Sequence, residues 1–179
     1  MKIDKSKLFV RKLKEEELSV YMKFVRYAKK NMEHPEWLGN FEKRDYIRMI
    51  NNGAVIYVWT QYENMNQIFS DINQFVACGV LMPTRKIEVA RFIQENLDSK
   101  EVIKFGPEIV HPDYIGNGLQ REVIEYLERV AIGHGYKHCI CTINSENIYS
   151  LRNLLKNNFE IVTKIEAKRG AKLVLKKDL

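Results

Sequence analysis

The chain has 179 residues, of which 45% are hydrophobic and 29% are charged. These values are typical of one globular domain and exclude a disordered or fibrous chain. The net charge of +6 suits a polyanionic ligand, but the basic residues are spread along the sequence, so no nucleic-acid-binding surface is indicated.

The N-terminal half predicts strands and helices that follow one another without a linker. Helices are indicated where apolar residues recur every three or four positions, and buried strands where both faces are apolar. In chain order these elements are a strand at 8–10, a helix at 15–32, a helix at 41–50 capped by Asn40, and strands at 54–59 and 74–81.

The next stretch predicts a helix between two strands. Thr84 is its expected N-cap, and four apolar residues recur at helical spacing, namely Ile87, Ala90, Ile93 and Leu97. The strand that follows, at 102–110, contains Gly106-Pro107, a pair that favours a bulge or bend over an unbroken ladder.

The C-terminal part continues the alternation of helices and strands. Its predicted elements are a helix from Leu119 to Gly133 or Gly135, a strand at 136–143, a helix capped by Ser145 that bears Ile148, Leu151 and Leu155, and strands at 159–165 and 171–175. Residues 1–179 are therefore expected to form one α/β domain with a mixed central sheet and helices on both faces.

The cysteines and the apolar runs bear on location. Cys78, Cys139 and Cys141 fall in apolar runs, which predicts buried, reduced thiols in a cytoplasmic protein. Cys139 and Cys141 have no second ligand pair at zinc-site spacing, so we expect no metal. No run of about 18 apolar residues could span a membrane, and residues 1–4 do not open a signal peptide.

A glycine-punctuated turn leads from the strand at 102–110 into the helix at Leu119. The first turn of a helix has unpaired N–H groups and a partial positive charge, and Gly116 and Gly118 remove side chains that would keep an anion away. A pyrophosphate would fit there, although such a turn also occurs as plain turn chemistry. Neither a Walker loop nor a dinucleotide fingerprint is present.

Two longer motifs carry a resemblance to a known family. The run Val110-His111-Pro112-Asp113-Tyr114-Ile115-Gly116-Asn117-Gly118-Leu119 resembles the acetyl-CoA signature of GNAT N-acetyltransferases. One helix and one strand later, Asn147-Ile148-Tyr149-Ser150 and then Lys156-Asn157-Asn158-Phe159 resemble the family's second signature. The resemblance implies the GNAT fold, with a mostly antiparallel sheet splayed between its fourth and fifth strands.

The chain departs from the family pattern at three positions. Ile115 stands where Arg or Gln is usual, so one side-chain contact to phosphate is expected to be missing. Gln120 replaces a small residue, and either bonds phosphate or simply begins the helix. Asn158 replaces a glycine, which agrees with the tolerance of Asn for the left-handed conformation at a helix end.

The resemblance implies acetyl-CoA as co-substrate and direct transfer of its acetyl group to a primary amine of a small molecule or peptide. The backbone of Ile109 and Val110 would pair with the pantetheine arm between the splayed strands. The implied cofactor-binding residues are Ile109, Val110, Ile115, Gly116, Asn117, Gly118, Leu119, Gln120, Arg121, Asn147 and Ser150. For Asn147 the alternative is a helix-capping role.

Catalysis needs a base, since a free alkyl amine has a pKa of roughly 10. Glu108 is the candidate, with a solvated edge carboxylate as the alternative. The family's usual proton donor, a tyrosine, falls at Leu154, which leaves Tyr149 as the candidate acid unless it only packs or faces solvent.

The acceptor region implied by the resemblance lies between the first two helices, where Glu33, His34, Glu36 and Trp37 occur. The helix at 84–97 is unusual for the family, and we consider it as a lid or as a homodimer contact through Phe92 or Ile93. A CoA-binding module without catalysis and a basic nucleic-acid-binding or partner-binding domain are the alternative functions.

Overall fold

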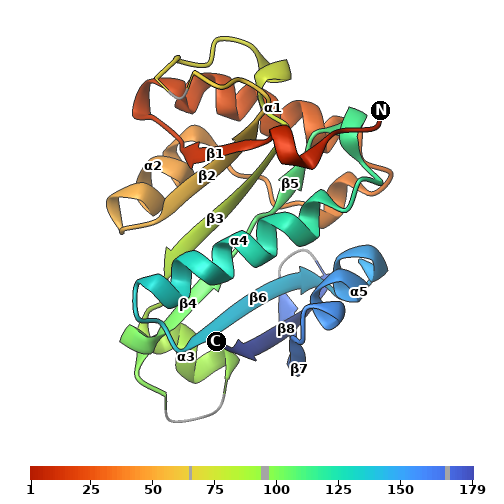
Figure 1. Cartoon of the computed structure of the whole chain (residues 1–179). Coiled ribbons are helices and arrows are strands. Elements are labelled where there is room, and N and C mark those ends of the chain that lie inside the picture. Colours follow the sequence, from red (N-terminus) through yellow and green to blue (C-terminus); the bar gives the residue numbers. More distant parts are fainter. Residues whose placement is uncertain (65, 94–96, 168–169) are drawn as a thin grey trace.

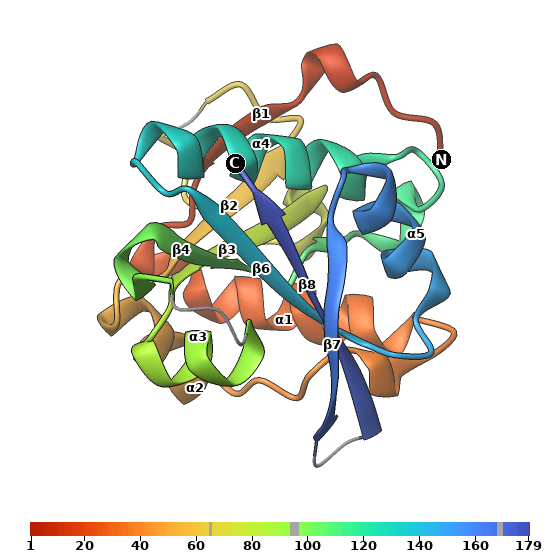
Figure 2. The same cartoon turned by 90° about the horizontal axis from the view of Figure 1, so that it is seen from below.

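The computed structural model describes residues 1–64, 66–93, 97–167 and 170–179. These residues form an eight-stranded sheet in the order β1-β2-β3-β4-β6-β8-β7, with β5 paired to β3 (Figures 1 and 2). The strands are β1 (Phe9–Lys12), β2 (Val55–Thr60), β3 (Ala77–Pro83), β4 (Val102–Phe105), β5 (Ile109–Val110), β6 (His138–Asn144), β7 (Glu160–Ala167) and β8 (Gly170–Asp178).

Helices cover both faces of the sheet (Figure 2). They are α1 (Leu18–Lys30), α2 (Lys43–Asn51), α3 (Lys86–Phe92), α4 (Leu119–Gly133) and α5 (Ile148–Lys156). The pair β4–β6 is parallel and the other strand pairs among the described residues are antiparallel. The mixed α/β architecture predicted from the sequence is confirmed.

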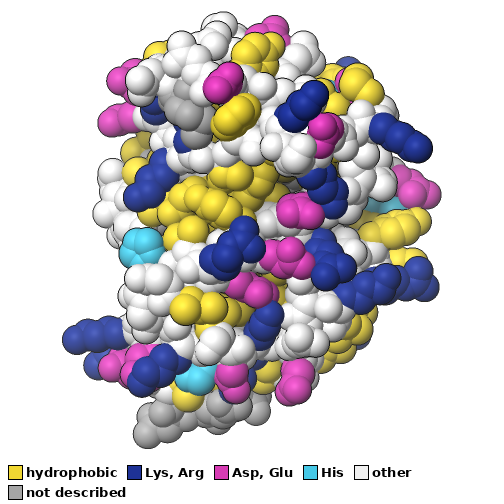
Figure 3. All heavy atoms as spheres, in the orientation of Figure 1, with side chains coloured by type: hydrophobic (Ala, Val, Ile, Leu, Met, Phe, Trp, Pro, Cys, Tyr) yellow, Lys and Arg dark blue, Asp and Glu magenta, His cyan; other side chains and the backbone are white. Residues whose placement is uncertain are grey.

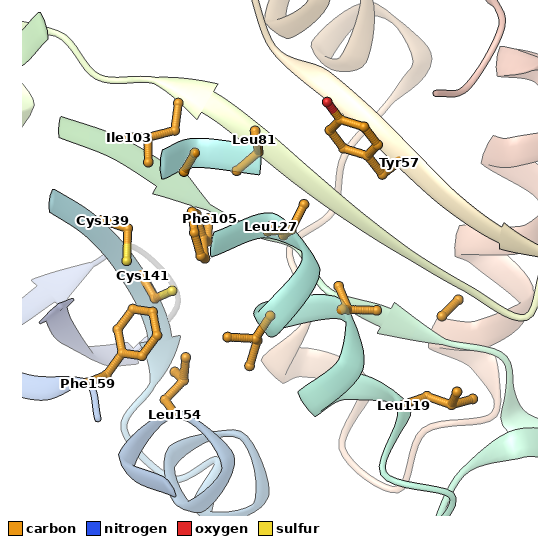
Figure 4. Close-up of a cluster of buried hydrophobic side chains, with 14 of the residues drawn as sticks. Tyr57, Leu81, Ile103, Phe105, Leu119, Leu127, Cys139, Cys141, Leu154 and Phe159 are labelled. Carbon is orange, nitrogen blue, oxygen red and sulfur yellow. The ribbon is translucent and has the colours of Figure 1, made fainter. Parts of the chain in front are cut away.

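Alternating strand residues contribute to buried clusters on both faces of the sheet. On one face Leu127 of α4 and Leu154 of α5 pack with Phe105, Cys139 and Cys141 (Figure 4). All three cysteines are buried and free, as expected. On the opposite face, α1 and α2 cover a cluster that includes Tyr21, Phe24, Tyr46 and Phe75, while α3 covers Val102, Ile140 and Val174.

Gly79 allows α4 to lie directly on the middle of the sheet. A Cβ at this position of β3 would come within 2.6 Å of Val123 Cγ1 and 3.0 Å of Leu127 Cδ1. The missing side chain therefore sets the height of α4 above β3, and with it the position of the loop that precedes α4.

The sheet parts beside β5. β4 pairs with β6 only from Val102–His138 to Lys104–Ile140, and then the chain bends at Gly106-Pro107, a cis peptide bond. β5 pairs with β3 instead, so residues 141–144 of β6 pair only with β8 among the described strands. The predicted bend and the splay between the family's fourth strand, here β4 and β5, and its fifth, here β6, are confirmed.

Three predicted helix caps are wrong, because the helices begin later than their polar flanks suggest. Glu42, not Asn40, precedes α2, and Arg85, not Thr84, precedes α3. The Thr84 hydroxyl donates instead to the carbonyl of Val102 at 2.6 Å. Ser145 is replaced as the cap of α5 by Asn147, whose Oδ1 accepts from the N–H of Ser150 at 3.0 Å.

The buried faces of α3 and α5 agree only in part with the predicted stripes. Ile93, at the end of α3, is buried and Leu97 packs on the core as expected. Ile87 is 70% exposed and Ala90 is exposed, and Val89 and Phe92 are buried instead. Phe92 and Ile93 fill the protein's own core, so they cannot form the suggested homodimer contact. Residues 94–96 of the predicted helix lie outside the described residues. In α5, Ile148 and Leu155 are exposed and Ser150 and Leu154 are buried.

No helix within the described ranges is both long and apolar enough to cross a membrane. On the face seen in Figure 3, basic and acidic side chains are interspersed over the region of α4, and apolar side chains gather between α4 and the β1–β2 region.

Candidate functional site

The loop between β5 and α4 presents a row of backbone donors. A short 3₁₀ turn at Pro112–Tyr114 leads to Gly116 and Gly118, whose φ angles are +86° and +70°. Five backbone N–H groups at this junction have no hydrogen-bond acceptor among the described residues. They belong to Gly116, Gly118, Leu119, Gln120 and Arg121. A Cβ at Gly116 would meet no atom within 4 Å, so the donors are open to an anion.

Most polar side chains predicted to bind the cofactor bond to other protein groups. Gln120 Nε2 donates to Ser150 Oγ at 3.2 Å, and Gln120 Oε1 accepts from Asn153 Nδ2 at 2.7 Å. Gln120 and Ser150 therefore join α4 to α5. Arg121 is paired with Glu125 at 2.7 Å, and Leu119 is buried in the core. Both residues therefore contribute backbone N–H groups, and not side chains, to the loop.

The two asparagines have local structural partners. Asn117 Nδ2 donates to the carbonyls of Met1 and Tyr114, at 2.8 and 2.9 Å, and its Oδ1 accepts from the N–H of Ile3. Asn147 Oδ1 accepts from the N–H of Ser150, so this atom has the helix-capping role that was the alternative to cofactor binding. The loop is thus a cradle of main-chain N–H groups, and Ile115, 63% exposed, adds an apolar side chain to it.

β5 turns one of its two residues toward the parted side of the sheet. Ile109 pairs with Cys78 and Val110 with Ala77, and the N–H of His111 donates to the carbonyl of Val76 at 2.9 Å. Donor direction alternates along an antiparallel strand, so Ile109 shares the direction of His111 toward β3. The N–H and C=O of Val110 point the other way, toward the side from which β6 has parted.

This arrangement of fold and loop has counterparts among solved structures. No family model matches the chain, and no curated protein is similar to it in sequence. A GCN5-related N-acetyltransferase from Kribbella flavida superposes with a TM-score of 0.70 over 98% of this chain and 100% of that one, at 13% identity. A ribosomal-protein-alanine N-acetyltransferase from Brucella melitensis gives 0.69 over 96% and 99%, at 16% identity. The chain has the GNAT fold.

A third GNAT-like neighbour is a putative acetyltransferase from Salmonella typhimurium, yncA, whose structure holds its cofactor acetyl-CoA. It superposes with a TM-score of 0.66 over 96% of this chain and 94% of that one, at 14% identity. These TM-scores and coverages show a shared fold over nearly the whole chain, although the sequence identities are low. Within this GNAT fold, the loop Gly116–Leu119 and the parted strands lie where the sequence resemblance implied.

Glu108 lies at the bend between β4 and β5, where its side chain is partly buried. Its Oε1 is buried and has no hydrogen-bond partner among the described residues. Burial raises the pKa of Glu108 to about 7, because the charged carboxylate loses hydration that a hydrogen bond from its own backbone N–H only partly replaces. The buried oxygen weighs against the solvated edge carboxylate considered as the alternative, and the group can exchange a proton near neutral pH.

Tyr149 and the segment between α1 and α2 come together at the start of α5. The Tyr149 side chain is 58% exposed, and its ring lies 6.5 Å from that of Trp37. Trp37 in turn stacks on His34 with ring centroids 4.0 Å apart. Leu154, at the position of the family's usual tyrosine, is 1% exposed in the core, and its side chain has no acidic proton to donate.

His111 is one residue whose surroundings the sequence did not reveal. It lies in the loop after β5, where it is 1% exposed and stacks on Phe24, with ring centroids 6.0 Å apart. Its Nδ1 accepts from the N–H of Asp113, and burial lowers the pKa of His111, which favours a neutral ring. His111 thus fixes the beginning of the loop against α1, a contact that no local pattern signals.

Proposed function

We propose that the chain is an N-acetyltransferase that moves the acetyl group of acetyl-CoA directly to a primary amine. The observation that carries the proposal is the row of unpaired N–H groups at the start of α4, beside a sheet that parts at β5. Such a row suits a diphosphate, and an open strand edge suits an amide-containing pantetheine arm.

The residues of the site divide the work of transfer. The N–H groups of Gly116, Gly118 and Leu119 bind the diphosphate. The N–H of Val110 donates to the thioester carbonyl and stabilises the negative charge that develops on its oxygen. Ile109 supports β5 on β3, a narrower role than the sequence implied for it.

Glu108 is the proposed base. With a pKa of about 7, its carboxylate can accept a proton from the acceptor amine, directly or through water, so that the neutral amine attacks the thioester. The ring group formed by His34, Trp37 and Tyr149 would face the acceptor, a small amine or a peptide. Tyr149 is the proposed donor of the proton that the departing CoA thiolate requires.

Release of free CoA thiol from acetyl-CoA tests this function. Purified protein is incubated with acetyl-CoA and a panel of polyamines, amino acids and peptides, and thiol is followed by a chromogenic disulfide. We expect amine-dependent thiol release and a product about 42 Da heavier than the acceptor, because an acetyl group replaces one hydrogen of the amine. CoA binding measured by calorimetry without turnover on any amine would contradict catalysis.

The second candidate is a CoA-binding module without catalysis. The observation in its favour is Leu154, buried where a proton donor would be expected. The buried carboxyl group of Glu108 weighs against it, because a binding module gains nothing from the cost of burying that group.

Tyr149 provides a separate test of the proton-return step. Tyr149→Phe is expected to lower kcat about tenfold, less than the usual general-acid contribution, because water can reach this exposed side chain and donate in its place. The KM for acetyl-CoA should stay unchanged. Tyr136→Phe is the matched control, since Tyr136 follows the C-terminal end of α4, whereas the glycine loop precedes its N-terminal end. Equal kcat values for wild type and Tyr149→Phe would exclude the acid role.

A further inference from the structure

The first residues of the chain lie against the loop that begins α4 (Figure 1). The N–H of Ile3 donates to Asn117 Oδ1 at 3.2 Å, and Asn117 Nδ2 donates to the carbonyl of Met1 at 2.8 Å. These two bonds join positions more than 110 residues apart in the sequence. They fix the path of the chain into the 3₁₀ turn η1 (Lys5–Lys7), so residues in that turn have a defined position relative to the loop.

The ammonium group of Lys5 lies close to the unpaired N–H groups at the start of α4. Lys5 Nζ lies 3.4 Å from the position that a Cβ on Gly118 would occupy, and 3.0 Å from Oε1 of Glu122 in the first turn of α4. Its side chain is 41% exposed, so a ligand can reach it. The charge therefore stands next to the unpaired N–H groups of Gly118 and Leu119.

The side chains at two neighbouring positions do not supply an equivalent charge, and the N-terminal ammonium of Met1 donates to the carbonyl of Asp113 at 2.6 Å. Ile115 is apolar. Arg121 pairs with Glu125, one turn further into α4, at 2.7 Å, whereas the paired Lys5 Nζ lies 3.4 Å from the Cβ position of Gly118. Glu122 itself would repel a phosphate at this helix end, and the ammonium of Lys5 offsets that repulsion. Because Lys5 neutralises this acid, the partial positive charge of the helix N-terminus stays available to an anion at the same place.

We propose that Lys5 binds the diphosphate of CoA as the charged side chain of an otherwise main-chain cradle. The proposal rests on the proposed function, since it assigns one more contact at the same cofactor site. A charge-assisted contact at a half-exposed position is expected to change affinity by about tenfold, or about 1.4 kcal/mol.

Calorimetry with CoA and with pantetheine, which lacks phosphates, tests Lys5. Lys5→Gln should weaken CoA binding about tenfold and leave pantetheine binding unchanged. Lys7→Gln is the matched control: Lys7 belongs to the same turn, is 77% exposed and faces Asp4 at 3.9 Å, so its loss should change CoA affinity less than twofold. The dependence of CoA affinity on salt should also become shallower in Lys5→Gln alone.

A charge placed on the loop gives a rescue experiment. In a Lys5→Gln background, Ile115→Arg should recover most of the lost CoA affinity, because the exposed side chain at position 115 emerges from the same loop. Equal CoA affinity in wild type and Lys5→Gln overturns the assignment of Lys5. Equal weakening of CoA and pantetheine overturns it too, since the loss would then not involve phosphate. A wild-type protein that binds no CoA overturns the proposed function itself.

Discussion

Replacing Glu108 by glutamine is expected to lower kcat for acetyl transfer about 10²- to 10³-fold while leaving the KM for acetyl-CoA unchanged. A positioned base with a pKa near the working pH contributes about this much, and glutamine keeps the size of the side chain but cannot accept a proton. Wild-type kcat/KM for the acceptor should rise with pH through about 7, and the variant should lack that step.

The same substitution is expected to make the protein more stable in alkali. Because the folded-state pKa of Glu108 is about 7 against an ordinary 4.5, the folded protein keeps a proton that the unfolded chain has released between these values. The free energy of unfolding therefore falls as pH rises through this window, by about 3 kcal/mol at 1.36 kcal/mol per pKa unit. The free energy of unfolding of Glu108→Gln should not fall in this way, because glutamine does not titrate.

Urea unfolding at pH 4 and pH 8 measures the effect, read as the change with pH in the stability difference between variant and wild type. Glu160→Gln is the control, because Glu160 is an exposed carboxylate at the start of β7. A Glu108→Gln protein that keeps full kcat, or that gains no stability relative to wild type on going from pH 4 to pH 8, would remove Glu108 as the base.

Much of the fold could be predicted because its determinants are local. The bend at Gly106-Pro107 and the left-handed conformation of Asn158, with φ of +62°, follow from the residues at those positions. The order of helices and strands follows from apolar periodicity. The N-caps of α2, α3 and α5 failed because each flank offered several polar residues, and tertiary packing decided where the first turn closes.

The strand β3 shows the same limit. It was expected from residue 74, but Asp71 and Gln74 form a capped 3₁₀ turn, and the strand begins at Ala77. A run that is apolar on both faces does not mark its own boundary, so the turn chemistry before it was missed.

The candidate site was predictable where the backbone defines it and not where distant segments meet. Gly116 and Gly118 locate the donors from sequence alone. The contacts of Gln120 with Ser150, of His111 with Phe24 and of Lys5 with Glu122 join separate parts of the chain. One sequence contains no signal for such pairs, and so the roles of these side chains came from the structure.

Replacing Gly118 by valine is expected to weaken CoA binding at least 100-fold. Gly118 precedes α4 with a φ of +70°, a conformation that a β-branched residue adopts only with strain of about 1–3 kcal/mol. A valine side chain would also project toward Lys5 Nζ, which lies 3.4 Å from the added Cβ. The substitution thus disturbs the free N–H groups and the proposed phosphate cation together.

Gly135→Val separates the effect on binding from the effect on the backbone. Gly135 follows the other end of α4 with a φ of +82° and has open space around its Cβ position, so valine there meets a similar backbone strain. At about 1.5 Å per residue, α4 places the two glycines roughly 25 Å apart. Both variants should lose comparable stability in urea, but only Gly118→Val should lose CoA in calorimetry. If Gly118→Val bound CoA as tightly as Gly135→Val, the start of α4 would not hold the diphosphate, and the donors at Gly116, Gly118 and Leu119 would need another explanation.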